Sequence, residues 1–253
     1  MNFWVVFRKE MMEQWRTYKV LIVGSVLFLF GLTSPLLAKF TPEMLAAVPG
    51  LPAGMSDFIP TPTVADAMTQ YIKNMSQFGI LLALLMSMGS VAQEKERGTA
   101  ALILTRPVSR GTFILAKFAA LKVTFVVSLL LALLGCWYYT WLLFEALPWG
   151  PFLLMNVLML VNFMVYIALT LLCSTLARSQ SAAGGLAFGG LILLAGLGAF
   201  PRLAEYMPGR LFDWGVGLVL DIGKPAWPAL WTSLGLIVVC LLAAGLIFRR
   251  QEL

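Results

Sequence analysis

Residues 151–176 read PFLLMNVLMLVNFMVYIALTLLCSTL, a stretch of 26 positions without one charged side chain. A helix rises about 1.5 Å per residue, so roughly 20 apolar residues cross the hydrocarbon core of a bilayer. The stretch is long enough to span that core, and it is far longer than an ordinary strand. It therefore predicts a membrane-spanning helix.

The remaining sequence contains five more apolar runs of comparable length. We expect six spans in all, near residues 20–38, 71–92, 118–144, 151–176, 182–200 and 227–248. Charged residues make up 12% of the 253 residues, whereas soluble domains carry about 25%. The sequence therefore predicts an all-α integral membrane protein, in which residues 1–253 form a single transmembrane domain.

The composition excludes several classes of enzyme and of ion-driven transporter. The chain has no histidine, which removes a His-ligated metal, a Ser-His-Asp triad and a His general base. Cys136, Cys173 and Cys240 lie inside apolar runs, where cysteines are usually small core residues rather than disulfide or zinc-site partners. No span carries a centrally placed charge for an ion or proton relay. We predict no metal site on this chain and no intramembrane protease or acyltransferase activity.

The distribution of basic residues predicts the topology. Thirteen of the 18 lysines and arginines lie on the side of Met1, and the five on the other side are Lys39, Lys73, Arg202, Arg210 and Lys224. The positive-inside rule then places both termini and the loops 93–117 and 177–181 in the cytoplasm. The segments 39–70 and 201–226 are expected to face outward.

Two segments outside the spans have a pattern of their own. Residues 1–19 alternate aromatic and charged side chains, which fits an amphipathic helix on the inner leaflet or a charged flank that only fixes topology. Residues 201–226 contain the short apolar stretch 216–220, flanked by aromatic residues such as Trp214 and Trp227. A re-entrant or interfacial hairpin before the sixth span and an ordinary interfacial loop both fit this segment.

The connection between the second and third spans is the most informative. Residues 93–117 read QEKERGTAALILTRPVSRGTFILAK. Gly98 is expected to end the second helix, Thr99 to cap a short helix and Ser109 to cap the third span, while Pro107 disfavours helix just before itself. A short helix held parallel to the membrane suits docking in a groove of a soluble partner. The residues alone also fit a solvated basic loop.

The same residues form a motif. It runs Glu94-x-Glu96-Arg97-Gly98-Thr99, then Leu102 and Leu104, then Arg106-Pro107-Val108-Ser109-Arg110 and Lys117. This motif resembles the loop of ABC-2 type permeases, the membrane subunits of ATP-binding cassette exporters. The six-span layout, the N-terminal segment and the last outer loop resemble that family too. Ala100 and Ala101 depart from it, because many members carry a Glu or a larger residue there.

The resemblance implies roles for these residues. In the family, the loop is a coupling helix that seats in a cleft of the ATPase subunit. Glu94, Glu96 and Arg97 would then be polar partners of the ATPase, and Leu102 and Leu104 would be its apolar anchor. Two further residues, Arg110 and Lys117, would either fix the loop at the lipid headgroups or simply determine topology.

The resemblance also implies partners. The sequence has no Gly-x-x-x-x-Gly-Lys-[Ser/Thr] phosphate loop, so we expect no enzyme activity and no cofactor here, with ATP and Mg held by separate ABC ATPase subunits. The expected function is that of a permease subunit of an ATP-driven exporter in a bacterial or archaeal cell membrane. Its other partners would be a second copy or a related permease and membrane lipid, but no nucleic acid. The alternative is a non-transporting anchor or mechanosignalling subunit for an ABC ATPase.

Two patterns inside the spans complete the candidate sites. Asn162, Tyr166, Thr170 and Ser174 follow one another at four-residue steps, as a pathway lining or as interhelical hydrogen-bonding groups, with the second favoured. In the fifth span, the motif Gly185-x-x-x-Gly189 predicts close helix packing. We expect that packing within the subunit, with a dimer interface as the alternative.

Overall fold

The computed structural model describes residues 3–46, 61–98, 109–144 and 146–251, and the regular structure in these ranges is helical throughout. The helices are α1 (Phe3–Arg16), α2 (Lys19–Ala46), α3 (Val64–Asn74), α4 (Ile80–Glu96), α6 (Arg110–Leu143), α7 (Trp149–Leu176), α8 (Gln180–Gly198), α9 (Pro201–Ala204), α10 (Arg210–Val219) and α11 (Trp227–Arg250). Met75–Gly79 is a π-helical turn that joins α3 to α4. The expected all-helical fold is confirmed.

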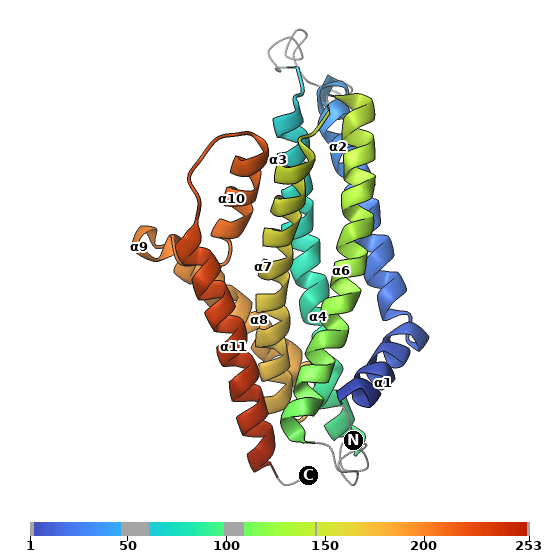
Figure 1. Cartoon of the computed structure of the whole chain (residues 1–253), viewed down its shortest axis with the longest axis vertical. Helices are drawn as coiled ribbons and strands as arrows, with labels where there is room; N and C mark the ends of the chain where they lie inside the picture. Colours follow the sequence, from blue (N-terminus) through green and yellow to red (C-terminus); the bar gives the residue numbers. More distant parts are fainter. Residues whose placement is uncertain (1–2, 47–60, 99–108, 145, 252–253) are drawn as a thin grey trace.

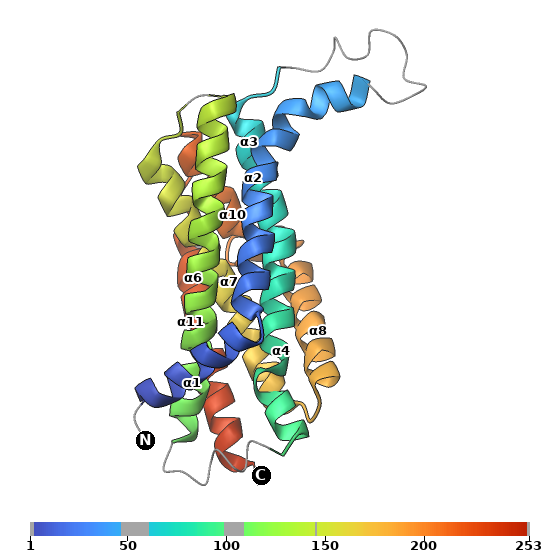
Figure 2. The same ribbon diagram turned by 90° about the vertical axis from the view of Figure 1, so that its right-hand side faces the viewer.

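Six helical segments in the described residues are long and apolar enough to cross a membrane. They are Lys19–Met44, Val64–Glu96, Arg110–Leu143, Trp149–Leu176, Gln180–Gly198 and Trp227–Arg250. Both chain termini lie at the same end of the bundle, and α1 lies across that end at an angle to the spans (Figures 1 and 2). We call this the terminal end and the other the opposite end. The expected number of spans is confirmed.

Two of the spans begin earlier than the hydropathy pattern predicts. The second was expected from residue 71, but its helix begins at Val64, where the backbone N–H of Thr63 donates to Asp66 Oδ2 at 2.8 Å. The third was expected from residue 118 but begins at Arg110, after Ser109. Hydropathy detects only the apolar part of a helix, whereas the helix itself extends to its cap.

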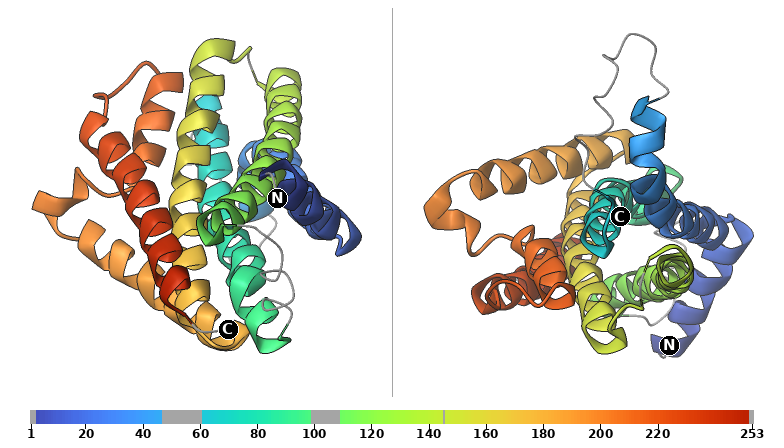
Figure 3. Two further views of the ribbon diagram at one scale, coloured as in Figure 1. Left: turned by 60° about the horizontal axis from the view of Figure 1, so that its bottom comes forward. Right: turned by 90° about the horizontal axis from the view of Figure 1, so that it is seen from above.

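Helix α7 forms the centre of the bundle. In the most hydrophobic 18-residue stretch of α7, 67% is buried within the chain, whereas the corresponding values are 11% for α8 and 22% for α11. Contacts with α4, α8, α10 and α11 surround α7, and α2 packs chiefly on α6 (Figure 3). The outward faces of α8 and α11 are therefore left to lipid or to another chain.

Glycines allow two of the closest approaches in the bundle. A Cβ added to Gly31 on α2 would lie 2.4 Å from the backbone oxygen of Ala132 on α6. One added to Gly79, in the π-helical turn, would lie 2.3 Å from Cζ of Phe163 on α7. Both distances are far below van der Waals contact, so these crossings require glycine.

The expected close packing of Gly185 and Gly189 within the subunit is wrong. A Cβ added to either would meet nothing within 4 Å among the described residues, and both lie on the exposed face of α8. The small residues that pack against the bundle are instead Ala183, Gly184 and Ala187. A Cβ added to Gly184 would lie 2.9 Å from Met88 Sδ. The face of α8 that packs inward carries Ala183 and Ala187, two positions before each of the two glycines in the helix. Gly185 and Gly189 therefore point away from the bundle.

The segment before the sixth span forms a hairpin of the helix α10 and the non-helical connection that returns from it to α11. Its helix α10 buries Leu211, Phe212 and Trp214 against the bundle. It stands beside α7 and close to α3 in the upper half of Figure 1. Gly223, with φ of +101°, lies in the connection that leads to α11.

Candidate functional site

One face of α1 is buried, although two of the three residues on that face are polar. Val6, Glu10 and Gln14 follow at four-residue steps and are 3%, 5% and 6% exposed. Buried polar groups need hydrogen-bond or charge partners, and α6 supplies them. Gln14 Oε1 accepts a hydrogen bond from the hydroxyl of Thr124.

Lys117 of α6 is the central charge at this contact. Its side chain is 2% exposed, and its ammonium nitrogen lies 3.0 Å from Oε2 of Glu10 and 3.0 Å from Oε1 of Glu94 on α4. The same nitrogen is 4.7 Å from the centre of the Phe113 ring. A buried ammonium is stable only when it is compensated, and here two carboxylates from different helices compensate it.

Lys9 adds a second ammonium on the outer side of the cluster. Its nitrogen lies 2.9 Å from Glu10 Oε1, 2.8 Å from Glu94 Oε1 and 3.1 Å from Glu13 Oε2. Burial alone would lower the pKa of Lys9, but the carboxylates of Glu10 and Glu94 outweigh it and hold that pKa above its usual range. We call Lys9, Glu10, Glu13, Glu94 and Lys117 the ionic clamp.

The charge of Glu13 is also stabilised by this cluster. Partial burial would raise the pKa of its carboxyl group, but the positive charges of Lys117 and Lys9 lower it overall. Oxygens of Glu10, Glu13 and Glu94 come within 4.8 Å of one another, a spacing at which carboxylates can hold a cation. The two lysine ammonium groups already supply positive charge there, so we assign these carboxylates to ion pairing between helices.

The clamp joins the two flanks of the loop that the motif marks. Glu94 lies in the last turn of α4 and Lys117 in the third turn of α6, and α1 lies across α6 (Figure 2). Helix α4 ends at Glu96, followed by Gly98 with φ of +67°. The oxygen of Ser109 accepts a hydrogen bond from the backbone N–H of Thr112 at 3.1 Å and caps α6. The expected end of the second helix at Gly98 and the cap at Ser109 are confirmed, whereas their part in ATPase coupling stays a prediction.

Arg110 binds protein carbonyl groups, a role that neither of its two expected ones, headgroup contact and topology determination, includes. Its Nη1 donates to the backbone oxygens of Phe248 at 2.6 Å, Arg249 at 3.2 Å and Gln251 at 2.6 Å. These are carbonyls at the carboxyl end of α11, where a cation is favoured by the helix dipole. The rings of Phe113 and Phe248 stack 5.4 Å apart beside this contact. The start of α6 is therefore fixed to the end of α11.

The end of α4 is fixed to α7 and α8. Ser174 Oγ donates to the backbone oxygen of Met88 at 2.7 Å and accepts from Ala92 N at 2.9 Å. The backbone N–H of Gln180, in the first turn of α8, donates to Glu96 Oε2 at 3.2 Å. A carboxylate at a helix amino terminus is favoured by the dipole, so Glu96 holds α8 as well as flanking the loop.

These positions revise the expected site. Lys117 faces the interior of the protein, where it pairs with Glu94, so it does not reach the lipid headgroups. The role of Glu94 at the ATPase stays a prediction. Arg97 and Glu96 are exposed at the terminal end. The other motif residues lie outside the described residues; they are Thr99, Leu102, Leu104, Arg106, Pro107 and Val108.

Sequence reasoning missed Glu10 as a functional residue. No local signal separates it from the other charges of the N-terminal segment. The sequence offered one indication of such a contact. Lys117 directly precedes the apolar run 118–144, and a lysine buried there needs an acidic partner.

The polar residues of α7 are all buried, which favours the packing interpretation. Asn162 Nδ2 donates to the backbone oxygen of Pro208, in the connection before α10, at 2.7 Å. Thr170 donates to the backbone oxygen of Tyr166 at 2.7 Å within the helix. With Ser174 bound to α4, two of the four residues join α7 to other elements.

Comparison with known proteins gives concordant results. A family model described as "ABC-2 family transporter protein" matches residues 4–253. The "Uncharacterized transmembrane protein YxlG" of Bacillus subtilis (strain 168) is 26% identical over 250 residues, which cover 98% of this chain and 97% of that protein. The similarity extends over nearly the full length of both chains.

Proposed function

Because the chain belongs to the ABC-2 family of transporter proteins, we propose that it is the permease subunit of an ATP-driven exporter. It is a multi-pass membrane protein with six candidate spans, and membrane subunits of this family lack the ATPase domain. In the proposed assembly, residues 1–253 act as one transmembrane domain. Two such subunits, copies or close relatives, work with two ABC ATPase chains that bind ATP and Mg.

The proposed orientation places the terminal end in the cytoplasm of a bacterial or archaeal cell. The excess of basic residues at that end supports it. Helix α1 then lies at the inner leaflet with exposed Trp4 and Trp15 at the interface. The hairpin with α10 lies at the outer face, where it caps or re-enters the bundle.

The ionic clamp is the observation that carries the proposed mechanism. When the ATPase chains close on ATP, they push on the coupling segment between Glu96 and Arg110. Through Lys117, Glu94 and Glu10, that push reaches α6, α4 and α1 together. Arg110 extends the connection to α11 and Glu96 extends it to α8. The segment therefore shifts a set of helices as one unit between two arrangements of the bundle.

The exposed face of α8 supports pairing with a second subunit. Gly185 and Gly189 leave a shallow surface there, and only 11% of the most hydrophobic window of α8 is buried within this chain. Small residues let helices of two subunits approach closely. The pathway between two mostly apolar bundles suits a lipid, peptide or hydrophobic drug better than a sugar or an ion.

The proposal is tested by reconstituting the chain with a co-expressed ABC ATPase in lipid vesicles. Glu10→Gln removes a buried carboxylate from the clamp, and Glu205→Gln removes an exposed one far from it. We expect the ATPase to copurify with both variants and export of a hydrophobic peptide or drug to fall at least tenfold for Glu10→Gln alone. Equal export by the two variants would contradict coupling through the clamp. ATP hydrolysis without any vesicle export by the unmodified complex would favour the mechanical anchor instead.

A further inference from the structure

A groove lies at the opposite end of the bundle, far from the clamp. It is bounded by α3, by α10 and by the connection that follows α10, and its volume is about 620 Å³. That size falls within the range of small-molecule sites, roughly 300–1,000 Å³. Helices α3 and α10 stand next to each other there (Figure 1).

The rim of this groove is basic. Lys73 of α3, Arg210 of α10 and Lys224 of the following connection all line it. These are three of the five basic residues that the sequence assigns to this side of the membrane. Arg210 Nη1 is paired with Asp213 Oδ2 at 3.0 Å. Lys73 and Lys224 have no ion-pair partner among the described residues, so the groove keeps an excess of positive charge.

The wall of the groove is mostly apolar. Ile72, Trp214, Val216 and Ile222 contribute to it. Trp214 is 9% exposed, and its indole Nε1–H has no acceptor in the described part of the chain. Tryptophan is enriched where a membrane meets water. An apolar wall under a basic rim matches an amphiphile with an anionic head.

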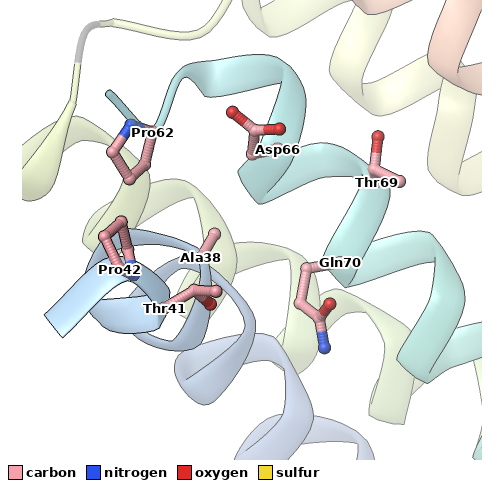
Figure 4. A pocket seen from close by; sticks show the side chains of 7 residues that line it. All are labelled: Ala38, Thr41, Pro42, Pro62, Asp66, Thr69 and Gln70. Atoms are coloured by element: carbon pink, nitrogen blue, oxygen red, sulfur yellow. The ribbon is translucent and has the colours of Figure 1, made fainter. Parts of the chain in front are cut away.

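A neighbouring hollow lacks this combination among its described residues. The hollow between α2 and α3 has a volume of about 290 Å³ and is lined by residues such as Thr41, Asp66 and Gln70 (Figure 4). None of the described residues that line it is basic, and the carboxylate of Asp66 is already bound to Thr63. It offers no charge for an anion, although it shares Thr69 with the basic groove.

We propose that the groove between α3 and α10 binds an anionic phospholipid of the adjacent leaflet. Lys73 and Lys224 contact the phosphate, and the acyl chains lie along Ile72, Trp214 and Val216. The lipid joins α10 to α3 and so braces the hairpin against the bundle. This site requires no ATPase partner, and its test does not depend on the chain being an exporter.

The test is a lipid titration of the purified chain in neutral detergent, read by native mass spectrometry. The probes are short-chain phosphatidylglycerol, phosphatidylcholine of the same chain length, and inorganic phosphate. Lys73→Gln/Lys224→Gln is compared with Lys39→Gln/Arg202→Gln, which removes the same charge from the same side outside the groove. Thermal unfolding without added lipid checks that both variants remain folded.

We expect phosphatidylglycerol to bind the unmodified chain more tightly than phosphatidylcholine. The groove variant should lose roughly 30-fold in affinity, from about 1 kcal/mol for each lysine near an anionic surface, and the control should change less than twofold. Equal losses in the two variants would overturn the proposal, because the effect would then be general electrostatics. Inorganic phosphate that blocks phosphatidylglycerol binding at millimolar concentration would overturn the lipid assignment in favour of a free anion.

Discussion

The ammonium nitrogen of Lys117 lies 3.0 Å from Oε1 of Glu10, although 107 positions separate the two residues in the sequence. Both side chains are almost fully buried, at 2% and 7% exposure. Breaking a buried ion pair by removing one partner leaves an uncompensated charge, which costs more than a surface pair does. This contact therefore fixes the N-terminal helix on the third span, beside the segment that we propose to receive the ATPase.

Replacing Lys117 should destabilise the protein. Lys117→Gln removes the buried ammonium that compensates Glu10 and Glu94, and we expect a loss of about 3–5 kcal/mol in the free energy of unfolding. The measurement is denaturant unfolding in detergent. Lys122→Gln on the exposed side of the same helix serves as the control and should change stability by less than about 0.5 kcal/mol. Equal stability of the two variants would show that the pair contributes nothing.

Adding one methyl group at Gly31 should separate α2 from α6. Because that methyl would lie 2.4 Å from the backbone oxygen of Ala132, Gly31→Ala is expected to cost about 1–3 kcal/mol. Gly24→Ala, on the same helix, would place its methyl 3.6 Å from Ser128 Oγ, an ordinary contact, and should be neutral or slightly stabilising. Thermal unfolding of both variants tests the difference, and a harmless Gly31→Ala would mean that the crossing is looser than described.

Acid should loosen α1, whereas moderately alkaline solution should not. The folded-state pKa of Glu13 is lowered from 4.5, so its stabilising contribution is complete above that value and is lost as pH falls through the lowered pKa. The pKa of Lys9 is raised, so its contribution is complete below its ordinary value of 10.5 and is lost as pH rises from there through the raised pKa. The protection factors of the amides in residues 3–16, which are exchange rates normalised to the unfolded chain at the same pH, should therefore fall below about pH 4, and Glu13→Gln should reduce that fall.

Much of the architecture could be predicted from the sequence, because the bilayer imposes a length and polarity on every span. Gly98 and Ser109 were also predictable, since each acts on its own stretch of backbone. The clamp was not predictable, because the partners of Lys117 lie on two other helices, and one of them is more than 100 residues away. The wrong placement of Gly185 has a similar cause: small residues occur all round α8, and only tertiary contacts decide which of them face inward.

The topology can be tested with single cysteines. Glu205→Cys, before α10, should react with a membrane-impermeant maleimide in sealed cells, and Arg178→Cys, between α7 and α8, should react only after lysis. Both positions are exposed, whereas Cys136, Cys173 and Cys240 are buried, so the unmodified chain is the background control. Labelling of Arg178→Cys from outside would reverse the orientation and remove the coupling segment from the cytoplasm.

The segment between Glu96 and Arg110 is proposed to dock the ATPase, and this is the central claim. The most direct measurement is the amount of co-expressed ABC ATPase that copurifies with the Leu104→Asp variant. An unpaired charge in the proposed apolar anchor costs a few kcal/mol, so we predict at least a tenfold loss of bound ATPase, while Arg97→Gln at the exposed flank loses much less. Both variants must first be shown to insert in the membrane with the topology described above. Undiminished ATPase on correctly inserted Leu104→Asp would contradict the account.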